Sequence, residues 1–486
     1  MALPAPDAGP LPLSLDRGLG TPMSGQLYDQ LRELILSGRL PPGTRLPSTR
    51  GLAAELLVSR NTVVACFDQL FAEGYVSGAV GAGTFVAEGA AGSGRTDKLP
   101  AIQDLPGPSQ RGTALAAMAP PRARRHRAFA VGVPALDAFP FAHWSRLMGQ
   151  AWRGPGVGTL ALGAPAGLDA LRAAIARYLA VARAVACSPD QVIVTSGIQQ
   201  GIGLTCQSLL NRGDRAWVED PGYPGVRGAL AGAGVDTVPV PVDAEGLDIE
   251  AGKALAGDAR LACVTPSHHY PLGTVMSLQR RLALIDWAER CDGWILEDDY
   301  DSEFRYRGRP LASLQGLDRS GRVIYAGSFS KVMFPSLRLG YLVVPEHLID
   351  TFLKVRAALD DHASLTAQPA LARFMEEGHF AAHVRRMRRL YGGRQEALLD
   401  AAGKHLDGLL TLAPDDAGMH LVGTLDDAKR DDVALAAKAD DAGIATVALS
   451  SYATSAAVRP GLVLGYAAVN EAEIMRAAKR LGEIMT

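Results

Sequence analysis

Six short apolar runs between residues 192 and 344 each have the length and the aliphatic content of a buried β-strand. They are VIVTSG (192–197), AWVED (216–220), LACVTP (261–266), GWILEDD (293–299), VIYAGS (323–328) and LGYLVV (339–344). Amphipathic segments, such as the one at 277–291, separate several of these runs. Strands that alternate with helices form a mainly parallel sheet that helices cover. We therefore predict an α/β domain in this part of the chain.

The composition changes between residues 88 and 127, where GAAGSG, LPGPSQRG and APPRARRHR occur. Gly, Pro, Ser and Arg at this density resist burial, which predicts a flexible linker at 88–127. The linker divides the 486 residues into an N-terminal domain at 12–87 and a C-terminal domain at 128–486. Within the C-terminal domain we expect a large subdomain at about 160–350 and a small α/β subdomain at about 355–486.

The overall charge and the cysteine content exclude several classes of protein. The formal net charge is −2, so any surface that binds nucleic acid must be local. No segment approaches the ~20 apolar residues of a membrane helix, and the N-terminus lacks the pattern of a signal peptide. Five scattered cysteines without a CxxC pair predict buried thiols in a reducing compartment. We therefore expect a cytoplasmic protein that has no zinc or other metal site and no contact with a membrane.

The N-terminal domain has the pattern of an amphipathic helix followed by two shorter, closely spaced helices. The first helix is predicted at 25–40 and ends at the turn PPG (41–43). Ser48 and Ser59 are predicted N-caps of the next two, because a serine hydroxyl accepts a hydrogen bond from the first helical turn. The apolar residues expected to face inward are Leu27, Leu31, Leu34, Ile35, Val63, Phe67, Leu70 and Phe71.

The helix after Ser59 begins with polar residues, and the stretch 81–86 is rich in glycine. A recognition helix presents such a first turn to the major groove, and glycines let a β-ribbon approach DNA closely. The run LPSTRGLAAELLVSRNTVVACFDQLFAEGYV…GAGTFV resembles the GntR-type winged helix over its whole length. We therefore predict that DNA is contacted by Arg50, Ser59, Arg60, Asn61, Thr62, Gly81, Gly83 and Thr84.

Two positions depart from the pattern of that winged helix. Val64 and Ala82 stand where relatives often carry basic residues, so we expect fewer phosphate contacts and a weaker salt dependence. The alternative interpretation is a small helical packing module with solvated arginines. It fits Arg60 taken alone, but it does not account for the continuous pattern.

In the C-terminal domain, Ser328-Phe329-Ser330-Lys331 follows a predicted strand, and Arg338 comes seven residues after the lysine. An amine among small hydroxyls, followed by a guanidinium, suits an aldehyde cofactor that carries a phosphate. The lysine would form an imine with the aldehyde, and the hydroxyls and the arginine would bind the phosphate. Because such a short motif also occurs by chance, its neighbours have to support it.

Further motifs supply the other groups that such a cofactor needs. Asp298 lies at the carboxyl end of a predicted strand, where a carboxylate can keep a pyridine nitrogen protonated. Tyr300 lies on the same face of that strand and can donate a hydrogen bond to a ring oxygen. The segment Gly197-Ile198-Gln199 turns from a strand into a helix, whose free N–H groups form an anion site. We expect Tyr223 to stack on the ring.

The motifs SGIQQG, EDPGYPG, TPSHHYPLG, EDDYDSEFRY and GSFSK…LRLGY resemble those of fold-type I aminotransferases, and most closely those of the MocR/GabR subfamily. The resemblance extends from about residue 128 to the C-terminus and implies pyridoxal 5′-phosphate (PLP) bound to Lys331. His268, or the adjacent His269, is expected at the oxygen edge of the ring. The other contacts that the resemblance implies come from Asp298, Ser328, Ser330, Arg338, Gly197, Ile198 and Gln199.

The resemblance also concerns residues outside these motifs. It implies an arginine for an amino-acid carboxylate near the end of the chain, for which Arg459 is the candidate and a solvated loop arginine the alternative. Leu162 stands where relatives carry a tyrosine that reaches the phosphate in the neighbouring subunit, so one bond of about 1 kcal/mol is expected to be missing. A homodimer is implied, with each winged helix packed head-to-tail against the partner, a swap that the linker permits.

Two functions fit this combination of domains. The first is a PLP-dependent transcription regulator that binds operator DNA and senses PLP, GABA, taurine or another amine or amino acid through the Lys331 imine. The second is an active aminotransferase with an accessory DNA-binding module, because Lys331, Asp298 and Tyr300 are the catalytic groups that turnover needs. We favour the regulator, because a sensor needs a helix that reads DNA whereas a catalyst gains nothing evident from one. Constitutive DNA binding with an inactive domain is disfavoured by the nearly complete set of cofactor groups.

Overall fold

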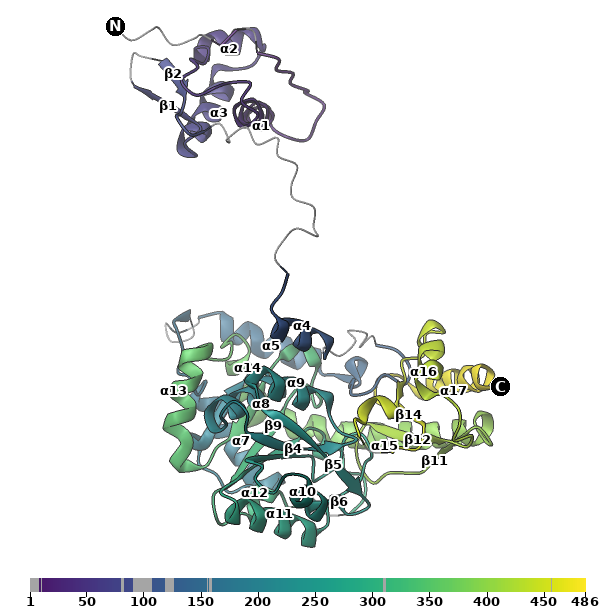
Figure 1. Ribbon diagram of the computed structural model, residues 1–486. Helices are drawn as coiled ribbons and strands as arrows, with labels where there is room; N and C mark the ends of the chain where they lie inside the picture. The colour runs from purple at the N-terminus through teal and green to yellow at the C-terminus, as the bar shows by residue number, and fades with distance from the viewer. Residues whose placement is uncertain are drawn as a thin grey trace. The chain divides into compact units, whose positions relative to one another are not determined.

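The computed structural model describes residues 8–9, 11–79, 83–90, 107–118, 126–154, 156, 160–308, 312–455 and 457–486. The chain forms two compact units, Met1–Pro108 and Ser109–Thr486, each with its own apolar core (Figure 1). Helix α4 (Gln110–Ala117) falls within the range predicted as a linker. It belongs to the second unit, where it contacts helix α9 (Pro224–Ala233).

The first unit is a winged helix. It contains α1 (Met23–Leu36), α2 (Thr49–Glu55), α3 (Arg60–Ala72) and an antiparallel pair of strands, β1 (Val76–Ala79) and β2 (Gly83–Val86). Both predicted caps are confirmed, since Ser48 accepts from the Gly51 N–H and Ser59 from the Thr62 N–H, each over 3.1 Å. These caps fix the start of α2 and of α3.

The core of the first unit confirms all the residues predicted to face inward except Phe71. The buried stripe of α3 runs through Val63, Cys66, Phe67 and Leu70. Phe71 follows this stripe by one residue, which turns its side chain about 100° away from the core, and 54% of it is exposed. The inward position that we assigned to Phe71 is therefore wrong.

The second unit is built on an eight-stranded sheet with the order β3-β10-β9-β8-β7-β4-β5-β6. β4, β5, β7, β8 and β9 are mutually parallel, whereas β10 is antiparallel to both of its neighbours. All six predicted strands are present, and β5 and β6 are additional. The strands are β3 (Val192–Thr195), β4 (Arg215–Asp220), β5 (Asp236–Asp243), β6 (Gly246–Leu247), β7 (Leu261–Val264), β8 (Trp294–Asp299), β9 (Val323–Ser328) and β10 (Gly340–Val343).

Helices cover both faces of this sheet, as Figure 1 shows. Alternate strand residues pack on one face against α8 (Ile198–Leu209), α9 and α13 (Ile349–Leu359). The residues between them pack on the other face against α10 (Ile249–Ala256), α11 (Leu278–Arg290) and α12 (Leu314–Leu317), where Trp217 stacks on Trp287. Both faces are therefore buried, which explains the continuous apolar runs of the sequence. Three more helices are α5 (Phe141–Trp152), α7 (Asp169–Ala182) and α14 (Gln368–Glu376).

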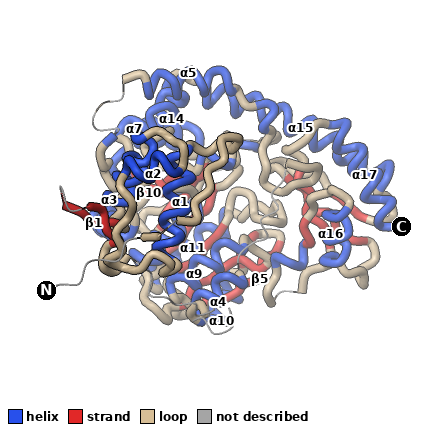
Figure 2. The backbone as a smooth tube through the Cα atoms, turned by 90° about the horizontal axis from the view of Figure 1, so that it is seen from above, coloured by secondary structure: helices blue, strands red, loops and turns tan. Residues whose placement is uncertain are grey.

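A second, antiparallel sheet of four strands forms the smaller C-terminal part, with the order β11-β12-β14-β13. The long helix α15 lies alongside α17, as Figure 2 shows. None of the described helices is long and apolar enough to cross a membrane. The elements are α15 (His379–His405), β11 (Leu410–Leu412), β12 (His420–Leu425), α16 (Asp432–Asp441), β13 (Val447–Ala448), β14 (Gly461–Gly465) and α17 (Glu471–Met485).

Candidate cofactor pocket

A cavity of about 140 Å³ lies at the carboxyl ends of the parallel strands of the large sheet. It takes residues from both sheets, because Met419 and His420 at the start of β12 line it as well. Ligands of open α/β folds bind at this edge of the sheet. Ten residues predicted to contact a cofactor line the cavity: Gly197, Ile198, Gln199, Tyr223, Asp298, Tyr300, Ser328, Ser330, Lys331 and Arg338.

Lys331 enters the cavity from the turn that follows β9. Its Nζ donates a hydrogen bond to the carbonyl oxygen of Gly132 over 3.0 Å. Gly132 has a positive φ of 68°, and a Cβ at this position would collide with Nζ. A glycine is therefore needed here for the lysine amine to occupy its position.

Asp298, near the end of β8, has the electrostatics expected of a partner for a cationic ring nitrogen. Its Oδ1 is buried and has no hydrogen-bond partner among the residues that the structure describes. Burial, and then the charges of Asp299, Glu219 and Asp301, raise the pKa of Asp298 to about 8. A buried carboxylate with an unfilled hydrogen-bond position fits a pyridine N–H, which would supply both a donor and a compensating charge.

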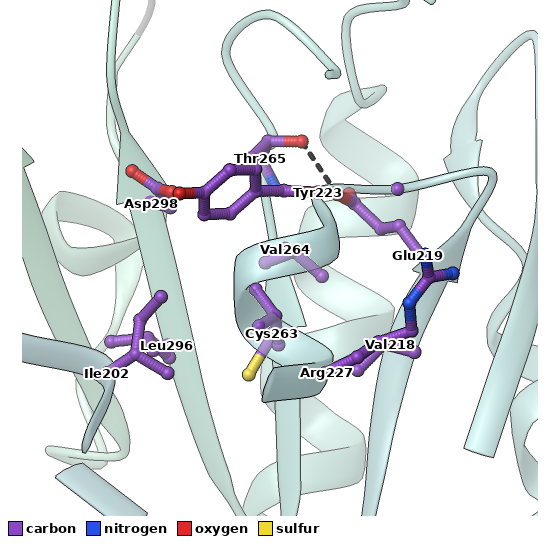
Figure 3. A pocket seen from close by; sticks show the side chains of 12 residues that line it. Ile202, Val218, Glu219, Tyr223, Arg227, Cys263, Val264, Thr265, Leu296 and Asp298 are labelled. Carbon is purple, nitrogen blue, oxygen red and sulfur yellow. Dashed lines mark hydrogen bonds between the residues drawn. The ribbon is translucent and has the colours of Figure 1, made fainter. Parts of the chain in front are cut away.

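A smaller cavity of about 20 Å³, shown in Figure 3, shares Tyr223, Thr265 and Asp298 with the larger one. Thr265 donates from its backbone N–H and its hydroxyl to the Glu219 carboxylate, over 3.0 Å and 2.6 Å. Burial nevertheless raises the pKa of Glu219 to about 7. The smaller cavity is therefore lined by two carboxyl groups, those of Glu219 and Asp298, and burial favours the neutral form of both.

The opposite end of the cavity has the features of an anion site. Helix α8 begins at Ile198, and the N–H groups of its first turn have no acceptor within the helix. The Arg338 guanidinium lies beside Gly197, where an added Cβ would be 3.4 Å from Nη1. The hydroxyl of Ser330 is buried and has no hydrogen-bond partner in the described part of the chain. A phosphate would satisfy these donors together, so the residues present fit the phosphate of PLP.

The two aromatic residues of the prediction also line the cavity. Tyr223 is the N-cap residue of α9, and its ring meets the ring of Tyr270 edge-to-face, 6.0 Å away. The Tyr300 hydroxyl lies 3.1 Å from Nδ1 of His268. His268 itself is buried and is not among the residues that line the cavity. His268 therefore contacts Tyr300 and does not itself line the cavity.

Arg459, the candidate for an effector carboxylate, lies elsewhere. Its side chain is exposed, and its Nε and Nη2 donate to the carbonyl oxygen of Leu425 over 3.2 Å and 3.0 Å. It is not among the residues that line the cavity. Among the residues that the structure describes, the arginine that lines the cavity is Arg338.

Sequence reasoning missed several lining residues. Thr265 and Tyr270 lie within the motif TPSHHYPLG, so the motif could have suggested them. Val131, Gly132 and His420 belong to segments without any recognisable pattern. They reach the cavity because residues near 130 bridge to Gly465 at the end of β14, which brings the start of the second unit beside the small sheet.

In the first unit, most of the predicted DNA contacts are exposed around the start of α2 and α3. Arg50, Ser59, Arg60 and Asn61 are exposed, and the half-buried Thr62 places Oγ1 2.8 Å from the Ser59 hydroxyl. Gly83 and Thr84 lie on β2, whereas Gly81 is outside the described residues.

One basic side chain beside this surface was not predicted. A Cβ at Gly83, where φ is 107°, would lie 2.8 Å from Nε of the exposed Arg45. Arg45 also forms an isolated β-bridge with Phe85 on β2. It therefore adds a guanidinium next to the ribbon.

Comparison with known proteins agrees with both halves of this description. Two protein-family models match the chain. The model of the bacterial regulatory proteins of the gntR family matches residues 23–86, and the model of the aminotransferases of class I and II matches residues 131–481. The probable rhizopine catabolism regulatory protein MocR of Rhizobium meliloti is 43% identical, over 94% of this chain and 92% of that protein. The HTH-type pyridoxine biosynthesis transcriptional regulator PdxR of Corynebacterium glutamicum is 33% identical, over 95% of each chain.

Solved structures show the fold of the second unit. A kynurenine aminotransferase of Pyrococcus horikoshii has a TM-score of 0.68 at 24% identity and covers 80% of this chain and 96% of its own. LysN, an alpha-aminoadipate aminotransferase of Thermus thermophilus complexed with N-(5′-phosphopyridoxyl)-L-leucine, has a TM-score of 0.67 at 25% identity and covers 78% and 94%.

The second unit is thus a fold-type I aminotransferase-like domain, the cofactor of that domain is PLP, and the first unit is a GntR-type DNA-binding winged helix. The chain belongs to the aminotransferase class I and II family and, within it, to the MocR/GabR type of HTH transcription regulators. The relatives named as regulators favour regulation over the alternative of an aminotransferase with an accessory module.

Proposed function

We propose that this regulator senses a small amine or amino acid, or PLP itself, at Lys331 and responds with altered binding to its operator DNA. The observation that carries the proposal is the set of unsatisfied groups around one cavity. Asp298 and Ser330 each keep a buried polar atom without a partner among the described residues, and the Lys331 amine lines the same cavity. A domain that had lost its ligand would have no reason to keep these costly groups.

Each group has a defined task in this proposal. Lys331 holds the cofactor covalently through its amine, and Asp298 holds the proton on the ring nitrogen. Tyr300 donates to the ring oxygen, and Tyr223 stacks on the ring. Bound PLP supplies an aldehyde carbon that exchanges one amine for another, together with a ring that withdraws electrons. The phosphate is held by Ser328, Ser330, Arg338 and the first turn of α8 at Gly197, Ile198 and Gln199.

Regulation requires that the ligand stabilise one arrangement of the domain over another. The position of the cavity supports such an effect. Ser328 and Asp298 reach it from the large sheet, and His420 reaches it from the small one. An amine bound in the cavity would be contacted by residues of both sheets, so its contacts would differ between two arrangements of those sheets. GABA, taurine and other amino acids are the candidates besides PLP.

The regulator is proposed to act as a homodimer in which each winged helix packs head-to-tail against the partner's large domain. A dimer suits an operator with two half-sites, one for each recognition helix. Within each winged helix, Arg60 and the other exposed residues at the start of α3 would enter the major groove, while Gly83 and Thr84 would approach the backbone.

Two measurements on one preparation test the proposal. The first is an absorbance titration of the PLP-loaded protein with a panel of amines, and the second is operator binding at each step of that titration. We expect one amine to change both signals over the same concentration range. Operator binding that ignores every amine and PLP would refute sensing, and steady turnover of an amino acid with a keto acid would favour the aminotransferase.

A further inference from the structure

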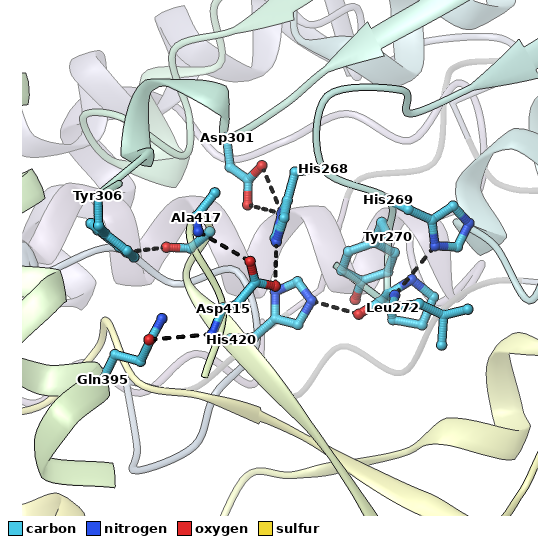
Figure 4. Close-up of polar contacts among 12 residues, drawn as sticks. His268, His269, Tyr270, Leu272, Asp301, Tyr306, Gln395, Asp415, Ala417 and His420 are labelled. Atoms are coloured by element: carbon cyan, nitrogen blue, oxygen red, sulfur yellow. Dashed lines mark hydrogen bonds and ion pairs between the residues drawn. The ribbon is translucent and has the colours of Figure 1, made fainter. Parts of the chain in front are cut away.

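His268 lies next to Tyr300, which lines the cofactor pocket. Figure 4 shows His268 between Asp301 and Asp415. His268 follows β7, and only 1% of its side chain is exposed. Its Nδ1 lies 3.1 Å from a carboxylate oxygen of Asp301 and 3.1 Å from the Tyr300 hydroxyl. Its Nε2 lies 3.1 Å from a carboxylate oxygen of Asp415. Both ring nitrogens therefore face a carboxylate.

These contacts require a proton on each nitrogen, because an ionised carboxylate only accepts hydrogen bonds. Burial by itself lowers the pKa of His268, but Asp301 and Asp415 outweigh it and raise the pKa to about 10. Burial and the His268 charge lower the pKa of His420 to about 4 and that of His269 to about 3. The positive charge of this histidine cluster is therefore located on His268.

The charge has a consequence for Tyr300. An imidazolium has two donors and no acceptor, so the Tyr300 hydroxyl can only accept a hydrogen bond from His268. Burial and the Asp301 charge also raise the pKa of Tyr300 well above its ordinary value, so the phenol keeps its proton. That proton remains available for donation into the cavity, which Tyr300 lines.

The same histidine connects the two sheets. Asp301 follows β8 of the large sheet, whereas Asp415 precedes β12 of the small one. Asp415 is oriented by the Ala417 N–H, which donates to its Oδ1 over 3.1 Å. A second hydrogen bond connects the same two regions, because Nε2 of His420 on β12 donates to the carbonyl oxygen of Pro271, in the loop after β7, over 2.9 Å.

Two glycines make room for this arrangement. Gly418 has a φ of 90°, and a Cβ there would collide with the ring of His268. Gly273 has a φ of 75°, and a Cβ there would collide with the Asp415 carboxylate. Because both glycines have left-handed backbone and no space for a side chain, the close approach of the two loops is a built feature of the fold.

We propose that His268 is a positioning residue, which holds the Tyr300 hydroxyl as a donor to the cofactor and ties the small sheet to the pocket through Asp415. The first role rests on the proposed function, since it concerns bound PLP. The second role does not depend on it. Ligand contacts near His420 would then be transmitted to Tyr300 through this tie.

The test of the first role uses the full-length, PLP-loaded protein and the pH midpoint at which its absorbance changes. In H268Q a positive charge near the pocket is lost, so the midpoint rises by about one pH unit. In D415N a negative charge is lost, so the midpoint moves the other way by a smaller amount, and the H268Q/D415N double variant lies between the two. A merely structural role would not produce opposite signs.

The test of the second role uses the apoprotein and its stability to urea as a function of pH. The folded pKa of His268, about 10, lies above its ordinary value of 6.5. Its stabilisation is therefore complete below pH 6.5 and is lost as the pH rises to 10. H268Q should remove this part of the pH dependence, whereas H347Q, at an exposed histidine, should retain it.

The outcomes separate the two roles from the proposed function. An unchanged absorbance midpoint in H268Q that still binds PLP would overturn the role toward Tyr300. An unchanged pH dependence of the apoprotein would overturn the charged tie. If H268Q does not fold, D415N still tests the first role by the direction in which its absorbance midpoint moves. We expect D415N to fold, because 24% of the Asp415 side chain is exposed. Failure of the wild-type protein to take up PLP would refute the proposed function, while the apoprotein measurement would still decide on the tie.

Discussion

The winged helix and the cofactor pocket expose their functional side chains to opposite degrees. In the first unit, Arg50, Arg60 and Asn61 are exposed, and all three lie in one short segment between positions 50 and 61. In the second unit, the lining residues come from positions as distant as Gly132 and His420, and Asp298 is buried. A DNA-binding surface needs solvated charges on a stable local scaffold, whereas a cofactor pocket needs desolvated charges that only a large fold can hold.

This difference determines what a mutation does. A substitution on an exposed surface removes one contact and leaves the scaffold intact. A substitution among buried charges also changes the ionisation of its neighbours, so its effects depend on pH and on the ligand. The following variants test whether the two regions behave in these different ways.

Lys331→Ala should have the largest effect and should affect the second unit alone. The amine that binds the cofactor is lost, so the near-visible absorbance of Lys331-bound PLP should disappear completely. Operator binding by α3 should persist but no longer respond to amines, which fluorescence anisotropy with labelled operator DNA would measure. Lys354→Ala, at an exposed lysine of α13 that pairs with Asp350, is the matched control. A response that survives in the Lys331 variant would place sensing elsewhere.

Asp298→Asn should have opposite effects on the apoprotein and on the loaded protein. The folded pKa of Asp298, about 8, lies above the ordinary value of 3.8, so the apoprotein loses stability as the pH rises from 3.8 to 8 and does not regain it above pH 8. The variant apoprotein should therefore resist urea better than the wild type at pH 8 and equally below pH 3.8.

The loaded protein should lose affinity in the same variant. Removal of the carboxylate leaves a cationic ring nitrogen unpaired, which should weaken PLP binding on the order of a hundredfold, about 3 kcal/mol. Asp407→Asn, at an exposed aspartate, should alter neither property. A lower stability of the Asp298→Asn apoprotein at pH 8 would show that the Asp298 carboxylate already has a stabilising partner in the apoprotein.

Arg60→Ala should weaken operator binding about 10- to 100-fold, corresponding to about 1–3 kcal/mol if the guanidinium reads a base. The PLP absorbance should not change, because Arg60 belongs to the other unit. Arg290→Ala, at an exposed arginine of α11, is the control. An equal loss on operator and unrelated DNA would indicate a phosphate contact, and no loss on either would exclude Arg60 from the interface.

The same contrast explains how far the sequence could predict the structure. Caps such as Ser48 and Ser59 act within a few residues, so they can be read directly from the chain. The six buried strands were recognisable because both faces of the sheet are covered. β5 was missed because it carries Pro239 and Pro241, which indicate a non-strand but are tolerated near the edge of a sheet.

The pocket was predictable only where motifs carry its residues. Lys331 and Asp298 lie in such motifs, and the structure brings them to the same cavity. The position of His268 was not predictable, because a motif gives the order of residues along a loop and not which of them faces the cavity. Its place beside Tyr300 depends on Asp415, which is 147 residues away in the chain.

Leu162→Tyr should produce the smallest effect and is the one expected gain. Leu162 is 82% exposed in the single protomer. This exposure is expected of a residue that contacts a partner subunit in the dimer. A tyrosine hydroxyl there should add one hydrogen bond to the cofactor phosphate of the neighbouring subunit, raising PLP affinity several-fold, by about 1 kcal/mol. Leu162→Phe supplies the ring without the hydroxyl, so a PLP titration of the two variants isolates the hydrogen bond. An equal gain in both would attribute the effect to packing, and a gain that remains at protein concentrations where the dimer dissociates would contradict a contact between subunits.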